Sequence, residues 1–368
     1  MELSGFKEFC YSANYGDIMI SGVDGAVILE LSKVGSGDLL LSESYMPDQT
    51  GVILISDIGR VLQAHIGLPE LELSGSMLPL LVVRFHLKGA DGRTLFDSTQ
   101  RVAYSRGYAV FGDGGQEYDR FISRYSIKET NERRREFVSF FHQGQTFSYA
   151  IAYMDGNGAK AVEHKTTACA VEDVIESRLF SLGEIVRLAQ EELDLTIVPA
   201  NVIYYDAILY KDDVVIDRIR FKNNTVPRLH EVSFLFYNLL GVPETVTFTG
   251  KEETSDEVNG EYGYFQGNYR KYSQQIIEPK KVNSGYIDRQ TLVSVRDMLS
   301  SPTLVLYEGD TLKDEVVITD ADFTRKAPSA APTSVTITYR KASRTQEEFN
   351  RPDYDDMIFF DTFDVTFV

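Results

Sequence analysis

The sequence contains no tryptophan, only two cysteines and five histidines, and fewer basic than acidic residues. The cysteines, Cys10 and Cys169, are too few for a disulfide framework, so we expect two unpaired thiols. Lys and Arg total 37 against 55 Asp and Glu, which gives a net charge of −18. Phosphate backbones and anionic lipid surfaces are bound through clustered positive charge, so this composition argues against nucleic acid and membranes as partners.

Long apolar runs are missing as well. No stretch reaches the ~20 consecutive apolar residues that a bilayer-spanning helix needs. Residues 1–17 contain no basic region followed by an apolar core, so no secretory signal peptide is visible. We therefore expect a soluble chain without membrane insertion.

Recognised catalytic and metal-binding motifs are also missing. No histidine lies three or four residues from another or close to a cysteine, and there is no G-x-S-x-G, P-loop or H-E-x-x-H motif. Residues 155–158 and 320–322 carry possible calcium ligands, but neither continues into the twelve-residue loop with its terminal Glu. The first is better explained as a hairpin turn. The sequence thus predicts no catalytic residue, no metal, no cofactor and no enzymatic activity.

Aromatic and β-branched residues are plentiful by contrast, and the clearest pattern spans residues 181–221. Its first third has apolar residues at helical spacing. Ser181 and Glu184 match a capping box, in which each side chain satisfies a backbone amide of the first turn. Residues 202–210 and 214–221 are strand-like and flank a polar turn. This stretch predicts a short helix followed by a β-hairpin.

The same order of parts recurs twice. Residues 56–104 contain a helical pattern and then two strand patterns around an Asp-Gly turn, and residues 288–323 contain a shortened version. Arginines occupy matching points of the three helical patterns, at Arg60, Arg187 and Arg296. Their spacing of about 110 to 130 residues is the size of an immunoglobulin-like sandwich. The alternative is that helix-then-hairpin recurs by chance in a β-rich chain.

We therefore predict a mainly β protein of tandem immunoglobulin-like β-sandwich domains, each with one short helix. The predicted units are a first sandwich with a C-terminal connector at residues 1–134, a second sandwich at 135–229, a third at 230–345, and an acidic and aromatic C-terminal arm at 346–368.

The connector between the first two sandwiches, residues 105–136, is polar and mixes both charges. Two interpretations stay open for it. The interspersed acids favour a solvated connection, whereas its arginines and lysine also suit a basic docking patch.

The third unit carries an acidic insertion, residues 251–281, that is rich in Tyr and Gly. It is either a long hairpin with exposed rings or a contact loop, because Tyr gives large contact area at low entropic cost. Its candidate partner-binding residues are Tyr262, Tyr264 and Tyr269.

The arm at residues 346–368 interleaves acidic and aromatic residues. One interpretation adds it as a last strand to its own sheet. The other adds it to a neighbouring subunit, where backbone hydrogen bonds supply affinity and phenyl rings fill pockets. Its acids would keep a free arm soluble. The candidate partner-binding residues are Tyr354, Phe359, Phe360, Phe363 and Phe367.

Two segments, FLFYNLLGVPETVTFTG at 234–250 and PDYDDMIFFDTFDVTFV at 352–368, resemble parts of tail-associated (baseplate or tail) structural proteins from prophages of gut anaerobes. The resemblance implies a virion- or particle-associated protein that is made in the bacterial cytoplasm. It also implies a non-enzymatic structural, assembly or adaptor role in a phage-tail-like particle. The implied partners are other protein subunits, including further copies of this chain. The alternative function is a surface adhesin or carbohydrate-binding array.

Overall fold

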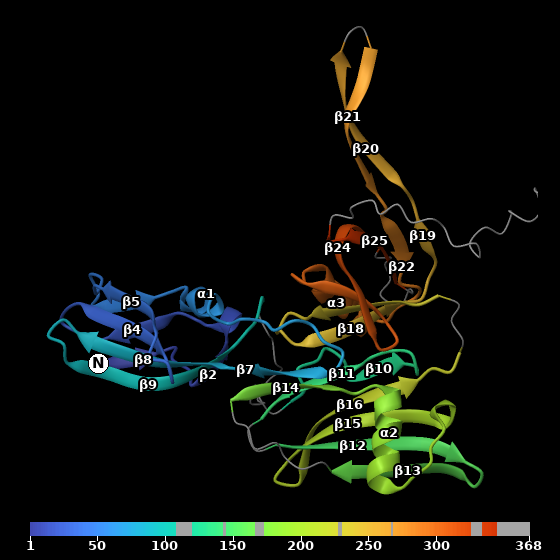
Figure 1. Cartoon of the computed structure of the whole chain (residues 1–368). Helices are drawn as coiled ribbons and strands as arrows, with labels where there is room; N and C mark the ends of the chain where they lie inside the picture. The colour runs from blue at the N-terminus through green and yellow to red at the C-terminus, as the bar shows by residue number, and fades with distance from the viewer. Residues whose placement is uncertain are drawn as a thin grey trace, which may run out of the picture.

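The computed structural model describes residues 1–107, 120–142, 145–165, 173–226, 230–265, 268–324 and 333–343. The protein is mainly β, and its strands form three tandem β-sandwich domains (Figure 1). Each domain carries one α-helix within the described residues. The predicted fold class is confirmed.

The first domain pairs a three-stranded sheet, β1-β3-β6, with a five-stranded sheet, β2-β9-β8-β4-β5. Residues alternate between buried and exposed along β4 and β8, so one face of the larger sheet packs against the smaller one. The predicted hairpin is confirmed as β8–β9. The elements are β1 Glu2–Ser4, β2 Phe9–Tyr11, η1 Ser12–Asn14, β3 Ile18–Ser21, β4 Val27–Lys33, β5 Leu39–Tyr45, β6 Val52–Ile55, α1 Ile58–Gln63, β8 Leu81–Gly89 and β9 Thr94–Ala103.

The second domain pairs the sheet β10-β16-β15-β12-β13 with the sheet β11-β14-β7, and helix α2 buries Ile185 and Ala189 in the core between them. Strand β7, Gly75–Pro79, comes from the first domain's part of the chain. The other elements are β10 Ile127–Thr130, β11 Phe137–Phe141, β12 Thr146–Asp155, β13 Gly158–Lys165, β14 Val174–Leu179, α2 Leu182–Leu193, η2 Pro199–Asn201, β15 Val202–Lys211 and β16 Val214–Asn223.

Two local predictions for this domain had different outcomes. The hairpin is confirmed as β15–β16, and Asp212 and Asp213 both have positive φ, as a two-residue type I′ turn requires. The capping box is wrong. The side chain of Ser181 makes no cap hydrogen bond, because its Oγ accepts one from the N–H of Glu136 at 3.1 Å instead. Glu184 pairs with Arg187.

The third domain uses one long strand in both of its layers. Strand β24 pairs with β23 up to Glu315 and with β25 from Val316 onward. Its helix α3 begins with a side-chain cap, since Asp288 accepts a hydrogen bond from the N–H of Thr291 at 2.7 Å. The elements are β17 Val232–Tyr237, β18 Pro243–Phe248, β19 Glu252–Thr254, β20 Glu257–Phe265, β21 Asn268–Ile277, β22 Lys280–Asn283, α3 Arg289–Leu299, β23 Leu304–Glu308, β24 Thr311–Thr324 and β25 Ser334–Lys341.

Two strands cross the domain boundaries that the sequence suggests, and both join the second domain. β10 lies before the predicted boundary at residue 134, yet it pairs in parallel with β16 of the second domain. β7 pairs with β14, and a Cβ on Gly75 would lie 2.4 Å from the carbonyl oxygen of Ser177. This close approach requires glycine. The second domain is therefore completed by residues from the first domain's part of the chain.

Candidate interaction sites: a tyrosine hairpin and a buried domain junction

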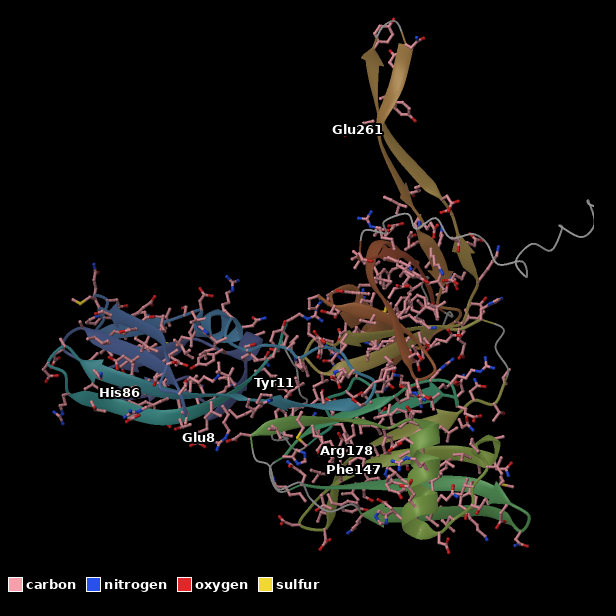
Figure 2. All side chains as sticks on the ribbon, in the orientation of Figure 1. Glu8, Tyr11, His86, Phe147, Arg178 and Glu261 are labelled. Atoms are coloured by element: carbon pink, nitrogen blue, oxygen red, sulfur yellow. The ribbon has the colours of Figure 1, made fainter. Side chains whose placement is uncertain are left out.

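The most prominent surface feature is the hairpin formed by β20 and β21. Within the described residues these two strands pair only with each other. The hairpin projects from the third domain, away from the rest of the molecule (Figure 1), and Glu261 marks its middle in Figure 2. The predicted long hairpin is thus confirmed.

The base of the hairpin is anchored in the third domain. β19 pairs with β22, and β22 pairs with β25, which places the fully buried Val282 in the core. The hydroxyl of Tyr339 donates a hydrogen bond of 2.5 Å to Glu252. Burial, and then this carboxylate, raise the pKa of Tyr339 well above its usual value. The hairpin therefore starts from an ordered sheet.

The outer half of the hairpin carries three tyrosines on one face. Tyr264 lies directly opposite Tyr269, and their rings contact edge to face at 5.2 Å. Tyr262 precedes Tyr264 by two residues and therefore shares its face. The three side chains are 61%, 67% and 78% exposed, in the order Tyr262, Tyr264, Tyr269. We call this surface the tyrosine face; it offers flat apolar rings, each with a polar hydroxyl.

A second candidate lies inside the molecule, around strand β11, where all five residues are buried. Phe140 packs into the second domain's core. Phe141 contacts Phe9 and Tyr11 of the first domain, at ring distances of 4.9 and 6.1 Å. Phe137 packs with residues of the third domain. One strand thus contacts all three domains, and Figure 2 shows Tyr11 between the first domain and this sheet.

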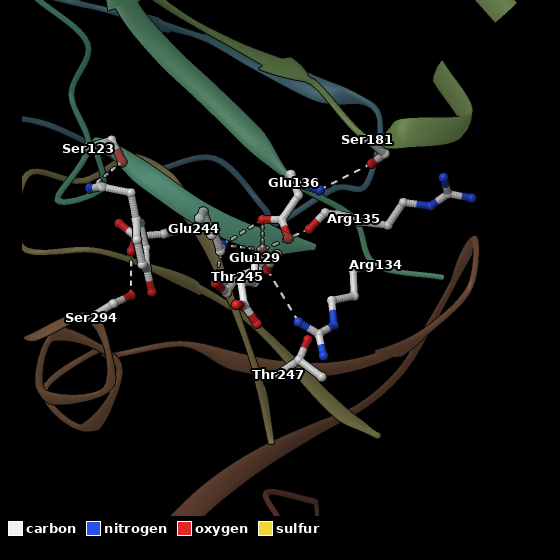
Figure 3. Close-up of polar contacts among 12 residues, drawn as sticks. Ser123, Glu129, Arg134, Arg135, Glu136, Ser181, Glu244, Thr245, Thr247 and Ser294 are labelled. Atoms are coloured by element: carbon white, nitrogen blue, oxygen red, sulfur yellow. Dashed lines mark hydrogen bonds and ion pairs between the residues drawn. The ribbon is translucent and has the colours of Figure 1, made fainter. Parts of the chain in front are cut away.

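Buried polar groups tie the second domain to the third at this junction (Figure 3). Lys128 lies 2.5 Å from the carboxylate of Glu136 and donates to the carbonyl of Thr245 at 2.7 Å. The Thr245 hydroxyl lies 2.7 Å from the carbonyl of Arg135 and 3.0 Å from the Glu136 carboxylate. The side chain of Glu136 is only 2% exposed, and Lys128 is the cation paired with it.

A second buried carboxylate, Glu244, lies beside this pair. Ser294 donates to one of its oxygens and Asn238 to the other, the latter at 3.0 Å. Burial raises its pKa, and the nearby charge of Lys128 opposes that shift only in part. Because Ser294 and Glu244 are both buried, this arrangement is a packed polar contact between β18 and α3.

The connector before β11 contributes the positive charges of this junction. Arg124 pairs with Asp297 at 3.2 Å, and Arg134 pairs with Glu231 at 2.6 Å. Phe121, which also belongs to this connector, is buried. The connection is therefore only partly solvated: Glu129, Glu132 and Arg133 are exposed, whereas Phe121 is buried. Its ion pairs join it to the third domain of the same chain. A basic docking patch for another partner stays a prediction.

The histidines add one more buried ionic group. Glu176 on β14 contacts both Arg178 of the same strand and His142, which directly follows β11, and Arg178 lies over the ring of Phe147 at 4.9 Å. Hydrogen bonds from His142 and Arg178 outweigh burial and lower the pKa of Glu176. Because Arg178 already neutralises this carboxylate, the group is arranged as a structural ion pair.

One pocket of about 240 Å³ lies between the second domain and residues 131–133 of the connector. Its amide side chains bind protein groups. Asn131 donates to Glu231 at 2.9 Å, and Asn223 donates to the carbonyl of Val202 at 2.9 Å. We therefore do not take it as the functional site.

The structure brings together Tyr262, Tyr264 and Tyr269 of the predicted site residues. The arm at residues 346–368 lies outside the described residues, as do its candidates Tyr354, Phe359, Phe360, Phe363 and Phe367. The predicted turn at residues 155–158 is confirmed between β12 and β13. Within the described residues, no cluster of three or more His, Cys, Asp or Glu is placed to hold a metal ion, and no helix is long and apolar enough to cross a bilayer.

Sequence reasoning missed Lys128, Glu136 and Glu244 as members of one cluster. The available signal was the pair of apolar residues Phe121 and Ile122 within the charged connector. Adjacent large apolar residues indicate that a segment packs against the protein rather than being fully solvated.

Comparisons with known proteins give little to set beside this geometry. No family model matches the chain, and neither does any curated protein. Among solved structures, the chain is similar to a fragment of native alpha-2-macroglobulin from Escherichia coli that spans domains MG0-NIE-MG1. The identity is 12%, the TM-score is 0.20, and the match covers 82% of this chain and 98% of that one. It is also similar to the N-terminal four Ig domains of Dscam1 isoform 4.44, with 8% identity, a TM-score of 0.15, and coverage of 82% and 70%.

Proposed function

We propose that this protein is a non-enzymatic structural or adaptor component that binds another protein subunit through the tyrosine face of its β20–β21 hairpin. The observation that carries the proposal is the exposure of Tyr262, Tyr264 and Tyr269 on a projecting hairpin. Exposed aromatic rings supply large contact area, and they lose little side-chain entropy on binding.

The rest of the chain supports a scaffold role for the three domains. All three contact β11, and the charged connector makes ion pairs within the molecule. The hairpin is left as the described element that reaches outward from this body (Figure 1). A phage-tail-like particle is the proposed setting, on the resemblance of residues 234–250 and 352–368 to tail-associated proteins.

The test is to co-express the chain with each protein encoded beside it in its genome and to measure complex formation by size-exclusion chromatography. The triple variant Tyr262→Ser, Tyr264→Ser, Tyr269→Ser should weaken binding at least about 100-fold, because interface tyrosines are often hot spots. A matched control is Tyr286→Ser, which removes a tyrosine that is 84% exposed and lies outside the hairpin. Unchanged binding by the triple variant would refute the proposal.

The tyrosine face also suits an alternative function, the binding of carbohydrate, because sugar rings stack on exposed aromatic side chains. Since the chain has no tryptophan, its fluorescence comes from tyrosine, and a stacked sugar should change that signal directly. A saturable change with an oligosaccharide that the triple variant loses would favour this alternative over a protein partner.

A further inference from the structure

The outer edge of β21 is an open strand edge. Within the described residues β21 pairs with β20 alone, so the backbone groups along its other side have no strand partner. An isolated two-stranded hairpin is marginally stable in water, and a third strand or an apolar covering is what normally makes such a hairpin persist. An exposed edge also invites pairing with another strand.

The described part of the chain ends close to this edge. β25 pairs with β22, with Tyr339 opposite Lys280. Continuing this ladder by two residues places Lys341 beside Glu278, the residue that follows β21. The described part of the chain stops at residue 343, so the remaining residues begin at the base of the hairpin.

Charge favours β21 over β20 as the edge that this segment would meet. β21 contains Arg270 and Lys271 and no acid, whereas β20 contains Glu257 and Glu261 and no base. Residues 358–368 carry two acids, Asp361 and Asp364, and no base, and residues 346–357 carry five further acids and one base. An acidic segment is therefore attracted to β21 and repelled by β20.

Length and pattern fit as well. Residues 358–368 would extend about 36 Å as a strand, against about 33 Å for β21. Residues 344–357 can span up to about 46 Å, which is long enough to place that strand alongside β21 in either direction. Phe359, Phe363 and Phe367 fall on one face of such a strand and would continue the tyrosine face.

We propose that residues 358–368 add to the outer edge of β21 in the same chain and complete the hairpin as a three-stranded sheet. Attachment within one chain makes the encounter intramolecular, so its effective concentration exceeds that of a second copy in dilute solution. This goes beyond the proposed partner contact, because it assigns an occupant to the strand edge rather than to the tyrosine face.

Hydrogen exchange of β21 amides, followed by mass spectrometry on the full chain without any partner, tests this. Truncation after Thr345 should speed exchange in β21 at least about tenfold. Asp364→Pro should do the same, because proline removes a ladder donor from the added strand. Glu348→Pro, placed in the linker, is the matched control and should leave exchange unchanged.

Two results would overturn the inference. One is exchange in β21 that is the same with and without residues 346–368. The other is protection that vanishes on a hundred-fold dilution of the intact chain, which would assign the edge to a second copy. The experiment contains no partner and the tyrosine substitutions leave the β21 backbone in place, so this inference and the proposed function can fail separately.

Discussion

Lys128 is the residue whose loss should be felt most at the junction between the second and third domains. Its side chain is 13% exposed and neutralises Glu136, which is 2% exposed. Buried ion pairs contribute little over an apolar substitute, but removing one partner leaves a charge with no compensation.

The first prediction is that Lys128→Met lowers the free energy of unfolding by about 3–5 kcal/mol, measured by urea denaturation. Adding Glu136→Gln should recover part of the loss, because the uncompensated charge is then gone. Lys251→Met removes the lysine of an exposed pair with Glu253 and should leave stability unchanged within error. If the two lysine substitutions cost the same, burial does not govern this pair.

The second prediction concerns pH. The folded pKa of Glu244 is raised, so the folded state binds more protons than the unfolded state between the two pKa values. Stability contributed by this group therefore falls as pH rises through that window. Glu244→Gln can still accept from Asn238 and donate to Ser294, and it cannot ionise. We expect the variant to gain stability over the wild type as pH rises from 4.5 to 7. Parallel stability curves for the two proteins would contradict this.

Glu176 should behave in the opposite way, because its folded pKa is lowered. Its contribution is present above the unfolded pKa and is lost as pH falls through the folded pKa.

At the scale of elements, we expect the β20–β21 hairpin to serve binding and the sheet at its base to serve the stability of the third domain. The base strands β19 and β22 belong to the third domain's sheet, whereas β20 and β21 form a separate sheet.

The third prediction is that replacing residues 257–277 with a short Gly-Ser turn leaves the melting temperature within about 2 °C of the wild type, because no apolar core of the described chain loses a member. Binding of a protein partner should be abolished by the same change. A large drop in melting temperature, followed by circular dichroism, would show that the hairpin supports the fold.

Elements whose determinants are local could be predicted, and those that depend on distant segments could not. The β15–β16 hairpin follows from two adjacent aspartates that tolerate positive φ. The pairing of β7 with β14 joins residues about one hundred positions apart, and no local pattern within Gly75–Pro79 indicates it. Ser181 was predicted as a cap from its neighbours, but the N–H of Glu136 competes for its oxygen. The tyrosine face needed only the alternation of a strand, whereas the Lys128 cluster needed the arrangement of two domains.

At the scale of the whole molecule, β11 makes the three sandwiches interdependent. Its Phe141 faces Phe9 and Tyr11 across the boundary between the first two domains, and Arg101 pairs with Asp173 nearby.

The fourth prediction is that Phe141→Ala loosens the first domain from the other two, because the ring that fills the boundary is lost. Below the unfolding transition, small-angle X-ray scattering should report a larger radius of gyration than for the wild type. Phe85→Ala creates a cavity inside the first domain's own core and should lower stability without changing that radius. Equal radii for all three proteins would mean that other contacts fix the domain arrangement.

The double burial of β11 has a consequence for how this sequence can diverge. A substitution at Phe137 or Phe141 must be accommodated by side chains of a second domain as well as by those of the second domain's own sheet. We therefore expect compensating pairs in related sequences between positions that are far apart in the chain. Strands β20 and β21 pack against no other domain among the described residues, so substitutions there need no compensating change. The hairpin sequence can therefore change together with its binding partner, while the interior of the protein changes slowly.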